Sequence, residues 1–530
     1  MSMDQQARAL WQRVKAPQKA AFFSCFVTGY LVHLYAFTNT IPNSDGLDRV
    51  YDTQQMTISG RWFLHFVSAL NDYTQMPAAI GLLSMLFLSL AAVLVTALLS
   101  FRSSVLAGLA GALMAAFPCT GYMFLYMFTA SAYSVAIFLA VLSVWLAARR
   151  GRGGWLLGIL CLACSMGIYQ AYVTVAISLS LLLVLRETLR PKAQRQKTIA
   201  FGVRMAAYLA AGAVLYYAIL MIFLKVKHLT LLSYLGMDAA SSGYPFAQLP
   251  RLLLSTYAQV VQFFFCAGAD NTFANGFLVA VDILALLAGV YFLVRYVTDR
   301  TLHRDGWRIA IAAAMLALLP LGMNFGQLLS PFSTPTPLMK YSFVTVYLLV
   351  LFAADLCDSR QPGWHAGALA AGTAALLLLF CLNTDNLLYT ASAQAHRATE
   401  SYATRLLARI ESCPGYETGM EIVIIGTIPE EQLCADIPSY AQVRHYSVPE
   451  NSALLRNKHL YYYLNDWLNF PAEEPDEETM ISVSASEEFA DMPLYPAQGS
   501  VQVVDGRVVV KLRDSYTPKE DYEIAYEQRR

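Results

Sequence analysis

Three carboxylates, Asp45, Asp48 and Asp52, follow the first long apolar run of the chain. A carboxylate at the boundary between water and lipid can take the proton of a sugar hydroxyl that attacks an activated sugar, or hold a cation that orients the reactants. Asp45 and Asp48 can also be turn formers, because the sequence NSDG at 43–46 favours a turn. The residues themselves leave both interpretations open.

Arg61 is the first candidate for binding a phosphate. A guanidinium pairs with a phosphate through two parallel hydrogen bonds, whereas an ammonium acts as a point charge. Its competitors on the same predicted side of the apolar segments are Lys225, Lys227, Arg251 and Lys340. Each lysine can instead be an anchor at the membrane interface.

Tyr169, Gln170 and Tyr172 are candidates for lining a sugar pocket, because hydroxyl and amide groups fix the orientation of a sugar. Packing between helices is the alternative role for all three. Asp282 lies within an apolar segment, where we expect it to be hydrogen-bonded to a neighbouring helix. The sequence holds no Walker loop, H-E-x-x-H, G-x-S-x-G or dinucleotide fingerprint in a fitting context, which argues against ATP-driven or soluble-enzyme chemistry.

The nine cysteines do not form a disulfide or metal framework, since seven of them lie in or beside apolar segments. Cys413 and Cys434 lie in the polar C-terminal part, where they form either a disulfide or two independent thiols. The sequence predicts no protein metal site and no certain cofactor, although the three aspartates leave room for a divalent cation.

The composition shows which elements must position these residues. Apolar residues make up 57% of the 530 residues and charged residues only 14%, against about 25% charged in soluble proteins. The mean hydropathy is +0.45. The sequence therefore predicts an integral membrane protein in contact with the lipid bilayer. Nucleic-acid binding is excluded, because no basic face accompanies the aromatic residues.

A membrane-spanning helix needs about 20 apolar residues. On this basis the chain is expected to be an all-α polytopic membrane protein with about eleven transmembrane helices. They lie near 21–40, 78–100, 104–120, 122–147, 154–169, 170–187, 203–225, 275–295, 308–328, 341–357 and 365–384. The first is expected to be a retained anchor, since it is too long for a signal peptide.

The distribution of basic residues predicts the orientation. With residues 1–20 in the cytoplasm, the cytoplasmic segments carry 19 basic residues and the opposite loops carry six, which fits the positive-inside rule. Two short helices within 154–187, rather than one long helix, keep the densely basic loop 186–204 inside. The expected location is the cytoplasmic membrane, with the N-terminus inside and the C-terminal domain outside.

Three long external segments are expected, two of them loops within the membrane domain at 21–384 and the third the C-terminal part that follows it. Loop 41–77 has Ile58, Trp62, Phe66 and Leu70 at helical spacing, and loop 226–274 contains a similar stretch at 246–265, so each predicts an amphipathic helix in the interface. Residues 385–530 carry 24 acidic and 12 basic residues. There we expect a helix at 387–410, a strand at 421–427, and a hairpin of 501–504 with 507–511 around Asp505-Gly506, forming a small extracytoplasmic α/β domain.

Two external motifs and one turn resemble a known family. PNSDGL at 42–47, followed by Tyr51, Gln54 and SGRW at 59–62, resembles the first external loop of GtrII-like glucosyltransferases, which are related to the GT-C superfamily. The resemblance covers about residues 20–400 and includes GIYQAY at 167–172. Relatives often carry an acid before the fourth span, where this chain has Ser131.

The resemblance implies transfer of a sugar, typically glucose, from a polyprenyl-phosphate carrier to a cell-envelope glycan outside the cytoplasmic membrane. It implies a GT-C-like fold, Asp45, Asp48 and Asp52 as catalytic residues, and substrate binding by residues that include Trp62 of the SGRW motif. Because Ser131 replaces an acid, a mechanism with two carboxylates is open to question. The alternatives are a flippase or transporter of lipid-linked glycans, and a non-catalytic envelope scaffold.

Overall fold

The computed structural model describes residues 2–47, 56–149, 151–231, 246–266, 276–329, 335–358, 366–446 and 452–517. Asp48, Tyr51, Asp52 and Gln54 lie outside these residues. The chain divides into two units, and each is described by itself. The helical unit comprises Met1–Asn39 and Tyr51–Asn386, and the tail unit comprises Thr40–Val50 and Leu387–Arg530.

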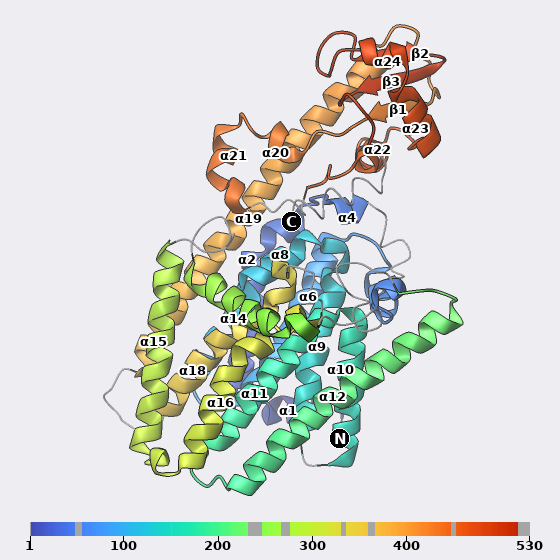
Figure 1. Ribbon diagram of the computed structural model, residues 1–530. Helices are drawn as coiled ribbons and strands as arrows, with labels where there is room; N and C mark the ends of the chain where they lie inside the picture. Colours follow the sequence, from blue (N-terminus) through green and yellow to red (C-terminus); the bar gives the residue numbers. More distant parts are fainter. Residues whose placement is uncertain are drawn as a thin grey trace. The chain divides into compact units, whose positions relative to one another are not determined.

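The helical unit is a bundle of long apolar helices, several of which run alongside one another in Figure 1. Its α-helices are α1 (Met3–Arg13), α2 (Ala16–Val32), α3 (Leu34–Thr38), α5 (Leu64–Ser68), α6 (Pro77–Leu99), α7 (Ser104–Ala116), α8 (Pro118–Leu125), α9 (Met127–Ala148), α10 (Arg152–Ile168), α11 (Val173–Leu189), α12 (Arg195–Val226), α14 (Leu249–Phe265), α15 (Gly276–Asp299), α16 (Gly306–Met323), α17 (Gly326–Leu329), α18 (Thr345–Asp358) and the first part of α19 (Ala366–Glu411). Its 3₁₀ helices are η2 (Met56–Ser59), η3 (Ala69–Asn71), η4 (Gln170–Tyr172), η5 (Phe246–Gln248), η6 (Leu302–Arg304) and η7 (Pro337–Val344).

Nine segments of the described residues are long and apolar enough to cross a membrane, so the chain is a multi-pass membrane protein. They are Pro77–Leu99, Ser104–Leu125, Met127–Ala148, Gln170–Leu189, Arg195–Val226, Gly276–Asp299, Gly306–Met323, Pro337–Cys357 and Gly367–Glu411. The two other expected spans, near 21–40 and 154–169, correspond to helices α2 and α10, which have only 17 residues each. The predicted pair of helices within 154–187 is present, with the break at Tyr169.

Two carboxylates inside the bundle are hydrogen-bonded, as buried polar groups require. Asp282 on α15 accepts a hydrogen bond of 2.8 Å from the Tyr347 hydroxyl, which confirms the structural role expected for it. Asp355 on α18 accepts hydrogen bonds from the backbone N–H groups of Arg102 and Ser103, at 2.8 to 3.1 Å. A carboxylate there satisfies donors at the N-terminus of α7, where the helix dipole also favours negative charge.

The described part of loop 41–77 is not one amphipathic helix, so that prediction is wrong. From Met56 onward the loop consists of η2, α5 and η3, with a turn at Gly60, where φ is +81°. Trp62 is buried, whereas Phe66 and Leu70 are exposed. Helical spacing in the sequence therefore did not put these residues on one face, because the backbone at Gly60 interrupts the helix. The second predicted helix is present as η5 and α14.

The tail unit contains a three-stranded sheet with helices on both faces (Figure 1). Strand β1 (Ile422–Ile425) pairs in parallel with β3 (Arg507–Lys511), and β2 (Val501–Val504) pairs antiparallel with β3. Asp505 and Gly506 both have positive φ, at 49° and 75°. A type I′ turn requires this combination, so the predicted hairpin is confirmed.

Successive residues of β1 point to opposite faces of the sheet, and both faces are covered. Ile422 and Ile424 pack with residues of α19 and α22, whereas Val423 and Ile425 pack with residues of α23 and α24. Leu47 joins the first of these clusters, so the short helix α4 is part of the tail core. The helices of this unit are α4 (Ser44–Leu47), α20 (Glu430–Leu433), α21 (Pro438–Val443), η8 (Arg444–Tyr446), α22 (Asn457–Asp466), α23 (Glu477–Ser484), α24 (Glu487–Asp491) and the second part of α19.

Cys413 and Cys434 are not joined by a disulfide. Cys413 belongs to the cluster formed by β1, β3 and α22, whereas Cys434 belongs to a separate cluster with Ala391 and Tyr440. Both side chains are buried, and burial raises the pKa of the Cys413 thiol. Of the two alternatives left open by the sequence, the structure has two separate thiols.

Candidate active site

Arg61 is held against aromatic rings in the helical unit. Its guanidinium carbon lies 4.7 Å from the centre of the Tyr169 ring, and its Nη1 donates a hydrogen bond of 3.2 Å to the Tyr133 hydroxyl. The rings of Tyr133 and Tyr169 are stacked, with their centres 4.6 Å apart. Stacking under a guanidinium restricts its rotation, so the planar group is held in one orientation before any ligand binds.

Tyr172 lies behind these two rings. Its ring centre is 5.3 Å from that of Tyr169 and 6.0 Å from that of Tyr133, and the side chain is 1% exposed. Tyr341 of η7 packs edge-on against it, at 6.5 Å. The structure therefore gives Tyr172 a packing environment, in which it supports the rings that hold Arg61.

Gln170 connects the turn between α10 and α11 to the SGRW segment at 59–62. Its amide nitrogen donates to the backbone carbonyl of Ser59 at 2.7 Å and to the Tyr216 hydroxyl at 3.1 Å. The same hydroxyl donates to the carbonyl of Gly60 at 3.1 Å. A Cβ atom at Gly60 would clash with Gln170 and would come within 2.5 Å of the Tyr216 oxygen, so glycine is needed for this contact as well as for its positive φ.

Trp62 fixes the other side of the same segment. A Cβ at Gly167, near the end of α10, would lie 2.6 Å from the indole, so this glycine lets the ring pack directly on the helix. The backbone N–H of Phe63 donates to the carbonyl of Gly167 at 2.7 Å. The Trp62 ring also stacks on Phe223, with ring centres 5.7 Å apart. Trp62 is therefore a buried anchor that positions its neighbour Arg61.

The remaining basic candidates are less closely connected to Arg61. The Lys227 ammonium lies 6.0 Å from the ring centre of Phe223, the ring that stacks on Trp62. Lys225 and Arg251 are exposed, on α12 and α14 respectively. Lys340 is partly buried in η7, beside Tyr341 in the sequence. The structure thus brings together Arg61, Trp62, Tyr169, Gln170 and Tyr172. Lys227 is connected to them only through Phe223.

Asp45 belongs to the tail unit, where it lies in helix α4 with its side chain exposed. The side chain of Asn43 accepts a hydrogen bond of 2.8 Å from the Gly46 backbone N–H, and the Ser44 N–H donates to the carbonyl of Ser452 at 3.0 Å. The polar residues around Asp45 therefore form the turn that the sequence suggested. Its carboxylate is left on the surface of this fixed turn. Asp48 and Asp52 fall outside the described residues.

Sequence reasoning did not identify Tyr133 and Tyr216, which hold Arg61 and Gln170. It also placed Asp385 at a domain boundary, whereas this residue is fully buried within α19. Both carboxyl oxygens of Asp385 are without a hydrogen-bond partner among the described residues, and they lie against Gly121. An acid directly after a predicted span is the sequence signal that would have identified it, since such groups are costly in a membrane unless they are used.

At Ser131, where the family resemblance led us to expect an acid, the hydroxyl donates to the side-chain oxygen of Asn71 at 3.0 Å. Asn71 is itself buried and donates to the carbonyl of Thr74 at 2.8 Å. This place is therefore occupied by a neutral polar pair. Among the described residues, no group of three or more His, Cys, Asp or Glu side chains could hold a metal ion.

Comparison with known proteins assigns the chain to a family. No curated protein and no solved structure shows significant similarity to it. The sequence model of one family, described as glucosyl transferase GtrII, matches residues 34–354. The match includes more than half of the chain and all the candidate residues from Asp45 to Lys340. The chain therefore belongs to the GtrII glucosyl transferase family and is a glycosyltransferase.

Proposed function

We propose that the protein transfers glucose from a polyprenyl-phosphate carrier to a cell-envelope glycan on the outer side of the cytoplasmic membrane. The observation that carries this proposal is the fixed guanidinium of Arg61, stacked on Tyr169 and hydrogen-bonded to Tyr133. A planar guanidinium held in one orientation suits a phosphate group, to which it can donate two hydrogen bonds. A lipid phosphate is already a competent leaving group, so the reaction needs no nucleotide.

The proposed reaction is a single displacement with inversion. The oxygen of an acceptor hydroxyl attacks the anomeric carbon of the sugar, and the bond from this carbon to the carrier phosphate breaks. The electron pair of that bond stays with the phosphate, whose charge becomes more negative by one. Arg61 stabilises this growing charge, and the carboxylate of Asp45 takes the proton of the hydroxyl. Asp48 and Asp52 are the alternative bases.

The sugar itself is held by the residues around Arg61. Gln170 is partly buried and carries an amide oxygen as well as the nitrogen that binds Ser59 and Tyr216. Tyr169 is buried and contributes the ring against which Arg61 is held. In this proposal Trp62, Tyr169 and Tyr172 are positioning residues, because their side chains are buried. Lys227 and Arg251 contribute positive charge for the carrier phosphate from farther away.

The proposal is tested with the full chain in proteoliposomes that contain polyprenyl-phosphate-glucose with a radioactive sugar. Addition of an envelope polysaccharide from the same cells should give radioactive polysaccharide and free polyprenyl phosphate. Movement of the labelled lipid to the other leaflet without transfer would favour the flippase instead. If neither transfer nor movement of the labelled lipid occurs, the non-catalytic envelope scaffold is the remaining alternative. Polyprenyl-phosphate-mannose, presented in the same way, tests whether glucose is the sugar.

A further inference from the structure

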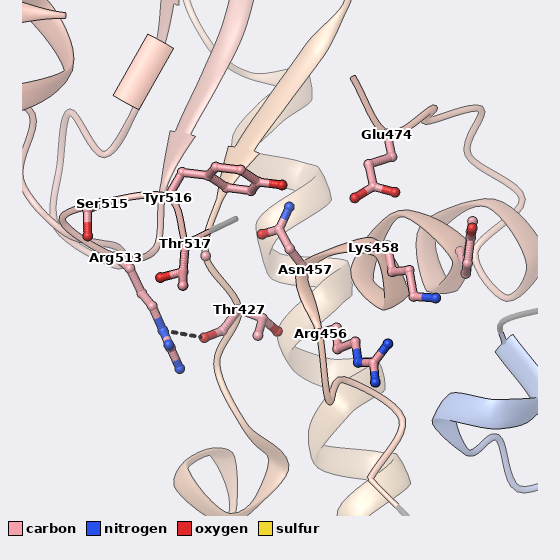
Figure 2. Close-up of a pocket in the computed structure, with 11 residues that line it drawn as sticks. Thr427, Arg456, Asn457, Lys458, Glu474, Arg513, Ser515, Tyr516 and Thr517 are labelled. Carbon is pink, nitrogen blue, oxygen red and sulfur yellow. Dashed lines mark hydrogen bonds between the residues drawn. The ribbon is translucent and has the colours of Figure 1, made fainter. Parts of the chain in front are cut away.

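A pocket of the tail unit gathers positive charge at one edge of the sheet. It has a cavity volume of about 290 Å³ and is lined by residues that include Arg456, Lys458 and Arg513. Figure 2 shows Asn457 between Arg513 on one side and Lys458 on the other, with Tyr516 and Glu474 also facing the pocket. The volume is close to that of a small ligand site.

The charge of this lining is opposite to that of the tail as a whole. From Asp385 to the end, acidic residues outnumber basic residues by 24 to 12. In the lining, three cationic side chains accompany one carboxylate, that of Glu474. A quarter of the basic residues of the tail thus lie around one pocket. In an acidic domain this concentration favours an anionic ligand, because the surrounding surface would otherwise repel it.

The position of the pocket on the backbone also favours an anionic ligand. Gly426 and Thr427 follow β1, and Arg513 lies two residues after β3, so the pocket is at the carboxyl end of the parallel strand pair. Ligands of open α/β sheets bind at this end. Asn457 begins α22, a helix of ten residues whose N-terminal dipole favours a negative group.

Two side chains in the pocket are already fixed by hydrogen bonds. The Nε of Arg513, which lines the pocket, donates to the carbonyl of Thr427 at 3.2 Å, and this hydrogen bond restrains the guanidinium (Figure 2). The Asn457 amide nitrogen donates to the carbonyl of Ile424 at 3.0 Å, while its oxygen is buried without a hydrogen-bond partner among the described residues. An unsatisfied buried acceptor is costly, and a ligand hydroxyl would satisfy it.

The combination of charge, an amide acceptor and aromatic rings indicates the ligand. Tyr462 and Tyr516 line the pocket beside the cations, and tyrosine supplies an apolar face together with a hydroxyl. We propose that this pocket binds a sugar that carries a phosphate or carboxylate group, as part of the acceptor glycan. The assignment to the acceptor rests on the proposed transferase function; binding of an anionic sugar does not.

The proposal is tested by calorimetric titration of the full chain in detergent with glucose 1-phosphate, glucuronic acid, inorganic phosphate and glucose. Both anionic sugars should bind more tightly than glucose and more tightly than inorganic phosphate, and binding should weaken as salt is added. Equal binding of glucose, or no binding of the anionic sugars, would overturn the proposal. The titration requires no turnover, so its result is independent of whether the protein transfers glucose.

Variants connect this binding to the pocket. Lys458→Gln and Arg513→Gln should each weaken glucose 1-phosphate binding by about tenfold, the loss expected for one charge-assisted hydrogen bond. Glu474→Gln should strengthen it, because a like charge is removed. Arg409→Gln, an exposed position on α19 outside the pocket lining, is the matched control. Unchanged affinity in both pocket variants, with unfolding temperatures like that of the control, would overturn the assignment of this pocket.

Measurement of KM for each substrate shows whether the anionic sugar bound in the pocket belongs to the acceptor or to the donor. If the acceptor supplies it, Lys458→Gln raises the KM for the acceptor glycan and leaves the KM for polyprenyl-phosphate-glucose unchanged. A raised KM for the donor alone would overturn the assignment to the acceptor and point to the donor phosphate. If transfer fails with the unmodified protein while glucose 1-phosphate still binds, the proposed function is wrong and the pocket stands.

Discussion

Arg61 combines a charge with a planar shape, and substitutions can separate the two. Lysine at this position keeps the charge but loses the stacking on Tyr169 and the second hydrogen bond to a phosphate. We expect Arg61→Lys to lower kcat/KM for the donor by about tenfold, because a cation–π contact contributes about 0.5–2 kcal/mol and about 1.4 kcal/mol corresponds to a factor of ten. Arg61→Gln should cost about 10²–10³, as loss of a donor to a developing anion does. Both are measured in the proteoliposome assay.

The control for Arg61→Lys is Arg149→Lys. The guanidinium carbon of Arg149 lies 3.3 Å from the ring centre of Trp145, so this variant also removes a contact between arginine and an aromatic ring. Arg149 follows α9, at the opposite end of that helix from Met127. Its substitution should leave kcat/KM within about twofold, since surface substitutions change little. Equal losses in the two variants would mean that Arg61 acts only through stability.

Substitution of Asp45 tests whether this residue is the general base of the proposed reaction. Asp45→Asn keeps the shape of the exposed side chain but cannot accept the proton, so turnover should fall by about 10²–10⁴. The fold of the turn should survive, because the hydrogen bonds of the Asn43 side chain and of the Ser44 backbone are unchanged. Normal turnover of Asp45→Asn, with loss of turnover in Asp48→Asn or Asp52→Asn, would move the role to another of the three aspartates.

The candidate residues differ in how far a sequence can predict them. Arg61 and Gln170 belong to short motifs, and these motifs made them candidates. Tyr133 is 72 positions from Arg61 and lies in the middle of an apolar segment. The chain has 31 tyrosines, and no local pattern separates one that binds a guanidinium from one that packs between helices. Such a contact depends on helix packing, which the sequence does not specify locally.

At the scale of elements, α10 positions the SGRW segment through one glycine. A Cβ at Gly167 would lie 2.6 Å from the Trp62 indole and 3.0 Å from the Cβ of Phe63. Neither group can move freely, because Trp62 is buried. We expect Gly167→Ala to destabilise the protein by about 1–3 kcal/mol, the usual cost of overpacking. The measurement is thermal unfolding in detergent, followed by tryptophan fluorescence.

The same helix supplies the control. Gly153 lies in the first turn of α10, and a Cβ there would meet no heavy atom within 4 Å. Gly153→Ala should leave the unfolding temperature unchanged or raise it, because alanine is favoured over glycine in a helix by about 0.5–1 kcal/mol. If both alanine variants unfold at the same temperature, the close approach of Trp62 to α10 does not determine stability.

Periodicity predicts elements well where the backbone is regular and poorly where one residue interrupts it. The hairpin at Asp505-Gly506 is correct, since a type I′ turn depends on two adjacent residues. The helix expected through Ile58, Trp62 and Phe66 is wrong, because Gly60 takes a positive φ in a segment that is hydrogen-bonded to η4 and α12. Helix spacing alone contains no information about that contact.

At the scale of the whole molecule, two units and one long helix define the organisation. The tail unit includes residues 40–50, whose buried Leu47 packs with residues more than 350 positions later. From the sequence these residues are predicted to be part of the external loop 41–77, because hydropathy describes only neighbours in the chain. Helix α19 is continuous from Ala366 to Glu411, although its first half is apolar and its second half contains charged residues.

The orientation of the chain rests on where its basic residues lie. Lys192 is exposed in the short connection between α11 and α12, which also contains Arg190 and is followed by Arg195 and Lys197. Arg308, at the start of α16, donates to the carbonyls of Thr188 and Arg190 at 2.9 and 2.6 Å and so fixes this connection. By the positive-inside rule we expect this connection to face the cytoplasm. The tail, with its excess of acids, is then expected outside.

Cysteine labelling in intact cells tests this orientation at two exposed positions. Cys266 is the exposed cysteine of the described residues, so it is first replaced by serine. In that background Ser482→Cys, on the surface of α23, should react with a membrane-impermeant maleimide in intact cells. Lys192→Cys should react only after the membrane is permeabilised, because the reagent cannot reach the cytoplasm. The reverse pattern would invert the orientation, and equal labelling of both in intact cells would contradict their placement on opposite sides.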